Sequence, residues 1–356
     1  MIPSIRFDHG IAGSFTALQI GRKRCSFLLN HATMWIVWHR ELMKKTVIPV
    51  LHRTGLTRRL DRRSAGSSVL ALNYHCVDPI VFRSHAKLLS TRAQMVDPAD
   101  IDHEVSRAEV ANRPRVVLTF DDGYANFVHR IHPILEQYGM RAIWFVPTDF
   151  FGSAEGYWFD RVRVAIKFSK SRQIQVVDKV WRLHRWGREF VANEVTEFMT
   201  TLTSDVLEAA VTDLLIQTGL PPTNQLEARR IATEDEIRSV DGRGVCVASH
   251  SRTHRNLPAL NDDDLNDELR GSKQTLEALL NREVEHFAFP SGDYDDRVVA
   301  RLHESGYRWG WTTDPGFVET ADLPFRIPRV LIDDRASDAV LSAKMSSWMH
   351  RAGVIH

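Results

Sequence analysis

The chain has 356 residues, 43% of them hydrophobic and 26% charged, and its formal net charge is +1. This is ordinary globular composition, and the length suffices for one large α/β domain with additions. The three cysteines, Cys25, Cys76 and Cys246, show no CxxC spacing, which excludes a disulfide framework and favours reducing surroundings.

The beginning of the chain is basic, whereas the remainder is mildly acidic. Residues 1–68 contain 12 Lys/Arg and 3 Asp/Glu, which leaves 34 and 42 for the rest. From Trp35 to Leu60 apolar residues recur near helical spacing among basic ones, although Pro49 interrupts a single helix. Two interpretations stay open: the segment lies on an anionic membrane surface, or it packs on the main domain with its basic side chains in water. We predict that residues 1–67 form a basic, partly disordered segment.

Signals for export and for nucleic-acid binding are weak. The first twenty residues include Asp8 and His9 and lack a basic stretch leading into an apolar run, so no secretory signal is visible. The apolar cluster from Met34 to Trp38 is too short to span a bilayer. Few aromatic residues interleave with the arginines, which argues against nucleic acid as a partner. We expect a cytoplasmic protein, either soluble or held at the inner membrane face by the basic segment.

Short β-type runs begin at residue 69 and alternate with helical patterns. The expected strands are Val69–Tyr74, Arg115–Phe120, Ala142–Val146, Gly244–Ser249, Glu285–Phe289, Arg308–Thr313 and Arg326–Ile332. Helical spacing predicts helices at Asn126–Tyr138, Asp262–Leu280 and Asp295–Ser305. This alternation predicts parallel strands joined by crossover connections, in a domain at residues 68–350.

One long interval departs from this alternation. Between Asp149 and Gly244 the only strand-like run is Gln175–Val177. Helical patterns occur instead, at Tyr157–Phe168, Val191–Leu202 and Ser204–Gly219. We therefore predict a mostly helical insertion at about residues 152–240, from which a capping box at Thr233–Glu236 returns the chain to the main domain.

Polar residues gather where the predicted strands end. These ends are Asn73–His75, Asp121–Asp122, Ser249–His254, Pro290–Gly292 and Thr313–Asp314. Parallel α/β barrels build their active sites at the carboxyl ends of the strands. The sequence therefore predicts one site assembled from these five segments.

The pair Asp121 and Asp122 ends a short, β-branched apolar run, in the stretch RVVLTFDDGY. Two adjacent carboxylates are costly to bury unless a cation or a proton lies between them, although an Asp-Gly turn is the simpler alternative. His250 and His254 are four residues apart and, with Asp122, would form a His₂Asp site typical of hydrolytic zinc. The alternative is a surface loop with solvated histidines, as we expect for His9, His31, His129, His132, His286 and His303.

A division of labour explains why two aspartates are needed. Asp122 would bind the cation, and Asp121 would act as general base toward a water molecule whose pKa the cation lowers. An acid must also protonate the leaving group, and His75 at the end of the first strand is the candidate.

Three motifs in this order, Thr119–Tyr124, Ser249–His254 and Phe287–Tyr294, resemble the polysaccharide deacetylases of carbohydrate esterase family 4, the NodB-homology domain. The resemblance covers about residues 68–335 without the insertion. It implies an α/β fold, a distorted (β/α)7-type barrel, with a divalent metal that is usually Zn²⁺. It also implies hydrolysis of an N-acetyl group from an amino sugar. By position, Asp121 becomes the base, and Asp122, His250 and His254 become the metal ligands.

The resemblance also suggests residues that contact the substrate or the oxyanion. The Pro290–Gly292 segment falls where the family supplies a backbone N–H to the oxyanion, and we assign that donor to Ser291. Further candidates for substrate or oxyanion contact are Tyr124, Pro290, Gly292, Trp311 and Arg329.

The sequence departs from the family pattern at two places, and these bear on the roles of His75 as the acid and of Arg329 as a partner of the base. Ala288 stands where many members have an arginine that holds the base, and the late leucine-x-histidine motif is absent. The chain is similar to the branch of poly-N-acetylglucosamine deacetylases, in which a tyrosine-histidine after the first strand supplies the acid. His75 fits that branch, and we hypothesise that Arg329 replaces the missing guanidinium.

The predicted function is N-deacetylation of N-acetylhexosamine units in a surface polysaccharide or its lipid-linked precursor, with release of acetate. One alternative is a deformylase of a lipid-linked aminosugar on the same fold. Another is a non-catalytic carbohydrate-binding protein with a vestigial site.

Overall fold

The computed structural model describes residues 69–106, 113–154, 156–184, 187–219, 226–227, 229–320 and 324–346. The basic segment predicted at residues 1–67 lies outside these residues, so both interpretations of it stay predictions. Within the described ranges, no helix is both long and apolar enough to cross a membrane.

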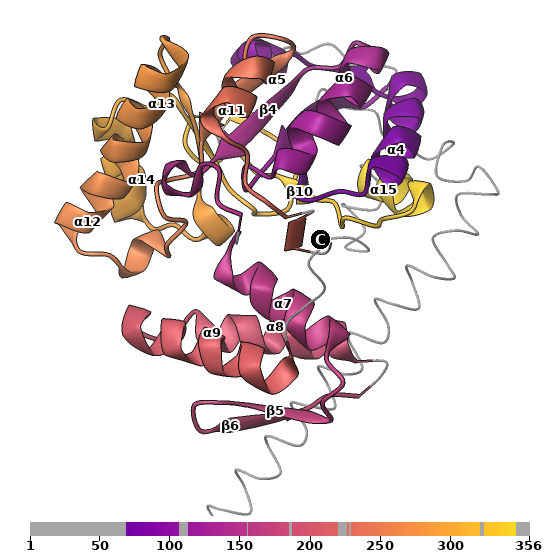
Figure 1. The fold of residues 1–356 in the computed structure, drawn as a ribbon. Coiled ribbons are helices and arrows are strands. Elements are labelled where there is room, and N and C mark those ends of the chain that lie inside the picture. The colour runs from indigo at the N-terminus through magenta and orange to yellow at the C-terminus, as the bar shows by residue number, and fades with distance from the viewer. Residues whose placement is uncertain are drawn as a thin grey trace, which may run out of the picture. The chain divides into compact units, whose positions relative to one another are not determined.

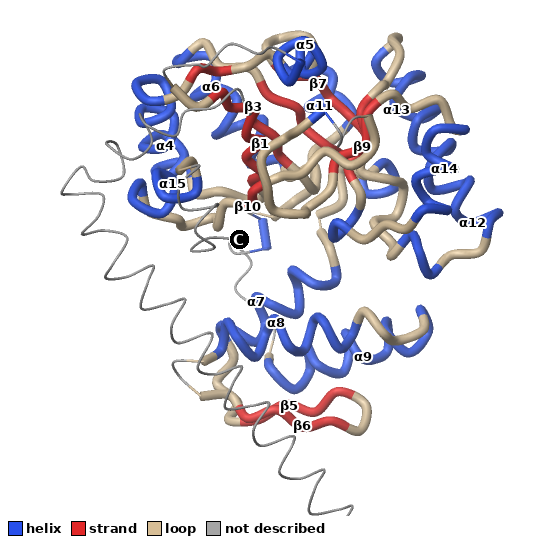
Figure 2. The backbone as a smooth tube through the Cα atoms, turned by 180° about the vertical axis from the view of Figure 1, so that it is seen from behind, coloured by secondary structure: helices blue, strands red, loops and turns tan. Residues whose placement is uncertain are grey.

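A curled parallel sheet forms the centre of the described chain (Figures 1 and 2). Its strands lie in the order β10-β1-β3-β4-β7-β8-β9, and the short β2 also pairs with β3. Their bounds are β1 Val69–Tyr74, β2 Gln94–Met95, β3 Arg115–Phe120, β4 Ala142–Val146, β7 Val245–Ser249, β8 His286–Ala288, β9 Trp309–Trp311 and β10 Val330–Leu331. All seven predicted runs contain one of these strands, and the two-residue β2 was not predicted.

The segment before β10 closes the sheet. Ile327 forms a parallel bridge with Trp311 of β9, and its N–H donates to the Gly310 carbonyl at 2.9 Å. Three residues later, Val330 pairs with Leu72 of β1. One short segment therefore touches both edges of the sheet, which confirms the predicted distorted barrel.

Strand periodicity decides which side chains enter the barrel. Successive residues of a strand face opposite sides of a sheet. Val69 and Ala71 of β1 belong to an inner apolar cluster, whereas Leu70, Leu72 and Tyr74 pack in the outer cluster with the helices. Further members of the inner cluster are Val117, Ile143, Phe145, Ala248, Ala288, Trp309, Trp311 and Ile327. The same alternation turns the next residues along, Asn73, Thr119 and Asp121, toward the interior at the carboxyl ends.

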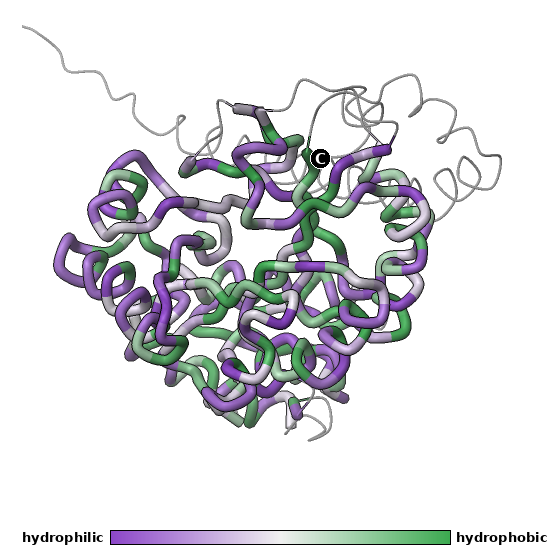
Figure 3. Tube along the Cα trace, turned by 90° about the horizontal axis from the view of Figure 1, so that it is seen from above, coloured by the Kyte–Doolittle hydropathy of each residue, from purple (hydrophilic) through white to green (hydrophobic). Residues whose placement is uncertain are grey.

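Helices cover the outer face of the barrel. They are α4 Pro79–Arg92, α5 Ile101–Ser106, α6 His132–Tyr138, α11 Glu234–Val240, α12 Asp262–Asn266, α13 Ser272–Leu280, α14 Asp296–Glu304 and α15 Asp338–Lys344. Two π-helical segments, η3 Phe127–Ile131 and η6 Asp267–Gly271, precede α6 and α13. In the described part of the chain, four 3₁₀ turns occur at η2 Pro98–Asp100, η4 Thr148–Phe150, η5 Leu257–Ala259 and η7 Pro290–Gly292. Figure 3 shows hydrophilic residues on the outer turns of these helices.

The three helices predicted between strands are confirmed, but α4 was missed. Its start carries a recognisable signal, because the Asp78 side chain accepts a hydrogen bond from the Ile80 N–H at 2.8 Å and Pro79 occupies the first helical position. The predicted capping box is present: the Thr233 N–H donates to Glu236 Oε2 at 2.8 Å, and the Glu236 N–H donates to Thr233 Oγ1 at 3.2 Å.

The insertion has an apolar cluster of its own. Helices α7 Trp158–Phe168, α8 Arg188–Met199 and α9 Ser204–Thr218 pack together beside a hairpin of β5 Gln173–Val176 and β6 Lys179–Arg182 (Figure 1). Val162, Ile166, Val195 and Leu214 form part of the cluster. The helical patterns are confirmed, but the antiparallel hairpin was not predicted. Its signal is the alternation of exposed and buried residues in Gln173–Val176, which is too short to stand out beside long helices.

Two histidines expected to be solvated are buried. His132 Nε2 donates a hydrogen bond to the Arg243 carbonyl oxygen at 3.0 Å. His286 lies beside the inner cluster, where its Nδ1 accepts a hydrogen bond from the Trp311 indole N–H at 3.2 Å. Burial, with the nearby charges of Arg282 and Arg308, lowers the pKa of His286 to about 3. The expectation of exposure is correct for His129 and His303.

The buried His286 predicts a specific loss of stability in acid. The unfolded ring has a pKa of about 6.5, so between this value and about 3 the unfolded chain binds more protons than the folded one. Stability therefore falls as the pH drops below about 6.5. We expect the melting temperature of the metal-free protein to fall less between pH 7 and pH 5 in His286→Gln than in wild type. The exposed His103→Gln should behave as wild type, and an equal fall in all three proteins would contradict the assignment.

Candidate functional site

The DDG motif changes the direction of the chain at the end of β3. Asp121 continues the strand with its side chain inward, and Asp122 then adopts a left-handed backbone with φ 72°. Gly123 follows with φ 65°, and an added Cβ there would lie 3.3 Å from Pro147 Cδ. This left-handed turn directs the two adjacent carboxylates to different partners.

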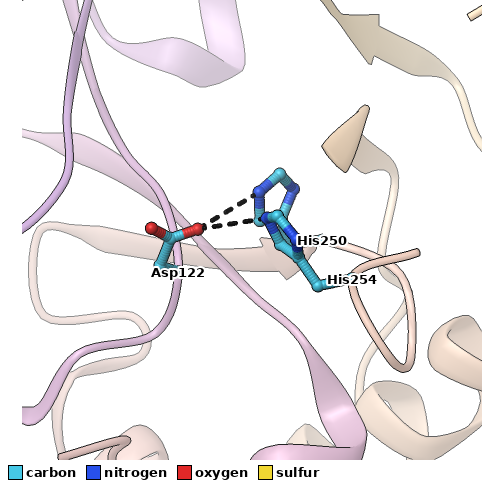
Figure 4. Close-up of side chains that lie close together, drawn as sticks. All are labelled: Asp122, His250 and His254. Carbon is cyan, nitrogen blue, oxygen red and sulfur yellow. Dashed lines mark ion pairs between the residues drawn. The ribbon is translucent and has the colours of Figure 1, made fainter. Parts of the chain in front are cut away.

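Asp122, His250 and His254 converge on one point (Figure 4). Asp122 Oδ1 lies 3.6 Å from His250 Nε2 and 3.4 Å from His254 Nε2. Ligands held about 2.0–2.1 Å from a tetrahedral zinc ion are about 3.3 Å apart, so these separations suit a shared cation. The candidate ligand atoms lie within 4.8 Å of one another, and the structure brings the three predicted ligands together.

The surroundings of His250 fix which ring nitrogen faces Asp122. Its Nδ1 lies 2.8 Å from the Ala288 carbonyl oxygen and therefore donates its hydrogen there. The lone pair of Nε2 is then directed toward Asp122, as in metal-binding histidines whose other nitrogen is hydrogen-bonded. Ala288, which stands at the place of the family arginine, thus supports the site through its backbone.

Asp121 is held by contacts from two other strand ends. Arg329 Nη1 lies 2.7 Å from Oδ1, and Nη2 lies 2.9 Å from Oδ2. Asn73 Nδ2 donates to Oδ2 at 2.9 Å. Burial opposes ionisation of Asp121, but the Arg329 guanidinium outweighs it, so the pKa of the carboxyl lies below its usual range. Asp121 is therefore a buried, ionised carboxylate.

Arg329 occupies the position required of a substitute for the family arginine. Its side chain is fully buried, and its Nε donates to the Thr312 carbonyl at 2.8 Å. The guanidinium is turned toward Asp121, and its candidate role in substrate or oxyanion binding stays a prediction. The two-pronged contact with Asp121 is the geometry that orients a carboxylate.

His75 lies at the rim of the site, and Ser291 follows the end of β8, three residues after the Ala288 carbonyl that contacts His250. His75 Nε2 is 3.9 Å from Asp121 Oδ2, and about a third of the His75 side chain, 34%, is exposed. Ser291 is exposed and has φ 56°. Within its segment, Pro290 has no N–H and the Gly292 N–H donates to Phe289 O at 2.9 Å, which leaves the Ser291 N–H as the segment's donor. Gly292 is required there, because an added Cβ would lie 1.8 Å from Thr313 Oγ1.

Two candidate substrate residues are buried instead. Trp311 is fully buried in the inner cluster, because it occupies an inward position of β9 below the strand end. Tyr124 is also buried, and its hydroxyl donates to Asp160 Oδ2 at 2.6 Å. Both side chains are buried, and their contact with a substrate stays a prediction.

The sequence did not identify two residues that contact the site. Asn73 had been placed at the right strand end but given no role, and strand periodicity could have pointed it inward. Tyr157 belongs to the insertion, yet its hydroxyl donates to the Asp122 carbonyl at 2.8 Å. No spacing within the sequence connects residues 157 and 122.

Comparisons with known proteins concern the family and the fold. A sequence model described as polysaccharide deacetylase matches residues 108–177 and 194–310, which is more than half of the chain. YxkH of Bacillus subtilis, which is assigned to the polysaccharide deacetylases, is 23% identical over 115 residues. That alignment covers 32% of this chain and 41% of YxkH, so the chain matches less than half of that relative.

One solved structure, PplD, is similar enough to show the same fold. The Streptococcus pyogenes deacetylase PplD, determined in complex with acetate, has a TM-score of 0.51 at 18% identity, and the match covers 78% of this chain and 98% of PplD. IcaB from Ammonifex degensii has a TM-score of 0.49 at 15% identity, covering 79% of this chain and 97% of IcaB. At these identities the likeness concerns the fold alone.

The Asp121–Arg329 pair predicts a large effect of one core substitution. Arg329→Met would leave Asp121 as an uncompensated buried charge, which typically costs about 3–5 kcal/mol. We expect the free energy of unfolding, measured by urea denaturation, to fall by about this amount. Arg326→Met, three residues away, removes an ion pair between exposed Arg326 and Asp296 and should change it by less than about 1 kcal/mol. Equal effects of the two variants would contradict the assigned role.

The three converging ligands predict metal binding that depends on each of them. His254→Ala should lower the affinity of the metal-free protein for Zn²⁺ by at least about 10-fold, since one of three protein ligands is lost. His303→Ala removes an exposed histidine of α14 and should bind zinc as wild type. Titration calorimetry measures both affinities, and unchanged zinc binding in His254→Ala would exclude this ligand set.

Proposed function

Because the chain belongs to the polysaccharide deacetylase family, we propose that it hydrolyses the acetamide of N-acetylhexosamine units in a glycan and releases acetate. Members of this family are hydrolases that act on amide bonds. The observation that carries the proposal is the pairing of a His₂Asp ligand set with a separate buried carboxylate, Asp121, at one end of the barrel.

The donor set suits a divalent metal, and we favour Zn²⁺. Two imidazole nitrogens and one carboxylate oxygen are ligands typical of hydrolytic zinc, and a site with three protein ligands leaves a position open. Bound there, the metal would polarise the acetamide carbonyl and lower the pKa of a water molecule. The protein holds the ligands for this purpose through the His250–Ala288 contact.

Asp121 would take the proton from the attacking water. Its two oxygens accept three hydrogen bonds from Arg329 and Asn73, and a carboxylate offers about four acceptor positions. These hydrogen bonds fix the orientation of the carboxylate. One acceptor position is left for a hydrogen bond from the attacking water. A base held in this way needs little reorganisation when the reaction begins.

The remaining steps involve Ser291 and His75. The Ser291 N–H would donate to the oxygen of the tetrahedral intermediate, which carries the developing negative charge. As the C–N bond breaks, His75 would give its proton to the nitrogen of the leaving amine. The products are acetate and a free amino sugar. Asp121 then releases its proton to solvent, and His75 regains one from solvent, which restores both groups.

We propose as substrate a surface polysaccharide or its lipid-linked precursor, processed by a cytoplasmic protein. What supports membrane proximity is the sequence of the basic segment at residues 1–67, which would favour an anionic lipid surface. Release of formate in place of acetate would identify the alternative deformylase. Glycan binding without turnover would identify a binding protein with a vestigial site, against which the complete ligand set and the enclosed Asp121 argue.

The test measures acetate from N-acetylglucosamine oligomers supplied with Zn²⁺. Asp121→Asn should keep the zinc affinity of wild type and lose about 10²–10⁴-fold in kcat, the usual contribution of a general base. His250→Ala should lose both zinc and activity. Asp235→Asn, an exposed carboxylate of α11, is the control and should retain both. Acetate release by Asp121→Asn at the wild-type rate would show that Asp121 is not the base.

A further inference from the structure

Two of the three proposed metal ligands have uncommon backbone conformations. Asp122 has φ 72° and His254 has φ 55°, both in the left-handed region that residues other than glycine seldom adopt. Such conformations persist where the surroundings impose them. Contacts that hold Asp122 and His254 therefore bear directly on the ligand geometry.

Tyr157, from the start of the insertion, makes such a contact with Asp122. It is the residue before α7, it is almost fully buried, and its hydroxyl donates to the Asp122 carbonyl at 2.8 Å. Burial raises the pKa of Tyr157 well above its usual value, so the hydroxyl keeps its proton and remains a donor. The hydrogen bond acts on the left-handed residue itself.

The same side chain also packs against the second ligand. The ring centroid of Tyr157 lies 5.5 Å from that of His254, and Phe159 lies 5.6 Å from His254. Tyr157 and Phe159 stack on each other at 4.8 Å with an angle of 7° between the rings. This aromatic pair forms a wall that limits rotation of the His254 ring.

A buried polar network connects the segment that carries Tyr157 and Phe159 to the barrel. Asp160, one residue after Phe159, accepts the Tyr124 hydroxyl at 2.6 Å and pairs with Arg229 Nη1 at 2.7 Å. Burial raises the pKa of Asp160, while the Arg229 guanidinium and the Tyr124 hydroxyl oppose this rise. Tyr124 follows the DDG motif, and Arg229 lies where the chain returns from the insertion. The first turn of α7 is thus tied to both.

We propose that Tyr157 is a positioning residue for the metal site and that the insertion supplies part of the active centre through it. The inference rests on the proposed function, because it assumes that Asp122 and His254 bind the metal. Contacts that orient metal ligands typically contribute 10–100-fold to metal affinity or activity. Tyr157 touches no reacting atom, so its effect is exerted through the ligands.

The test removes the phenolic hydroxyl from each of two buried tyrosines and compares the variants. Tyr157→Phe keeps the aromatic wall but removes the hydrogen bond to Asp122. Tyr307→Phe is the matched control, since its hydroxyl donates to the Leu269 carbonyl at 3.1 Å and lies 3.1 Å from the Ser272 hydroxyl, and no hydrogen bond joins it to Asp121, Asp122, His250 or His254. Zn²⁺ affinity of the metal-free proteins, melting temperature, kcat and KM on N-acetylglucosamine oligomers are measured for both.

We expect both variants to melt slightly below wild type and only Tyr157→Phe to lose zinc affinity, by about 10–100-fold, and kcat, with KM little changed. The Co²⁺-substituted protein should show an altered visible absorption spectrum in Tyr157→Phe alone. Equal zinc affinity and kcat in the two variants would overturn the inference while leaving the proposed function intact. Failure of wild type to bind zinc would overturn both, whereas zinc binding without acetate release would count against the proposed function only.

Discussion

Two adjacent carboxylates at the end of a buried strand impose the main constraint on this structure. Their mutual repulsion and the loss of water around them would be prohibitive if both faced the same way. The left-handed turn at Asp122 and Gly123 separates them. Asp121 then meets a guanidinium inside the barrel, and Asp122 meets two imidazoles at its mouth. The chemistry of the site follows from this separation, because one carboxylate is kept from the ligand cluster and available to water.

The pairing of Asp121 with Arg329 also links the site to the closure of the barrel. Arg329 lies between Ile327, which bridges to β9, and Val330, which pairs with β1. Its guanidinium therefore reaches Asp121 only when this segment joins both edges of the sheet. Opening of the barrel at β10 would withdraw the positive charge and leave Asp121 buried without a partner. Catalytic geometry and fold stability consequently depend on the same few residues.

Much of this arrangement was predictable because it follows from simple periodicities. Apolar runs gave the strands, and polar residues at the strand ends gave Asp121, Asp122, His250 and His254. Arg329 was suggested by the resemblance, as a replacement for the family arginine that is absent at Ala288. The burial of Trp311 and Tyr124 was not predicted. A motif shows which residues are near the site, but not whether each side chain points toward the metal ligands. Trp311 points into the barrel before the carboxyl end of β9, and there it packs in the inner apolar cluster.

What the sequence could not give are the contacts between the insertion and the barrel. The hydrogen bond from Tyr157 to Asp122 joins segments 35 residues apart and depends on how α7 begins over the site. Such contacts arise from the packing of one element on another, which no periodic pattern in the sequence indicates. The insertion has its own apolar cluster and needs no support from the barrel for its core, yet it buries Asp160 against Tyr124 and Arg229. The buried Asp160 carboxylate must keep its two partners, and this requirement fixes the orientation of α7. A fixed α7 in turn holds the contacts that Asp122 and His254, with their uncommon backbone angles, require.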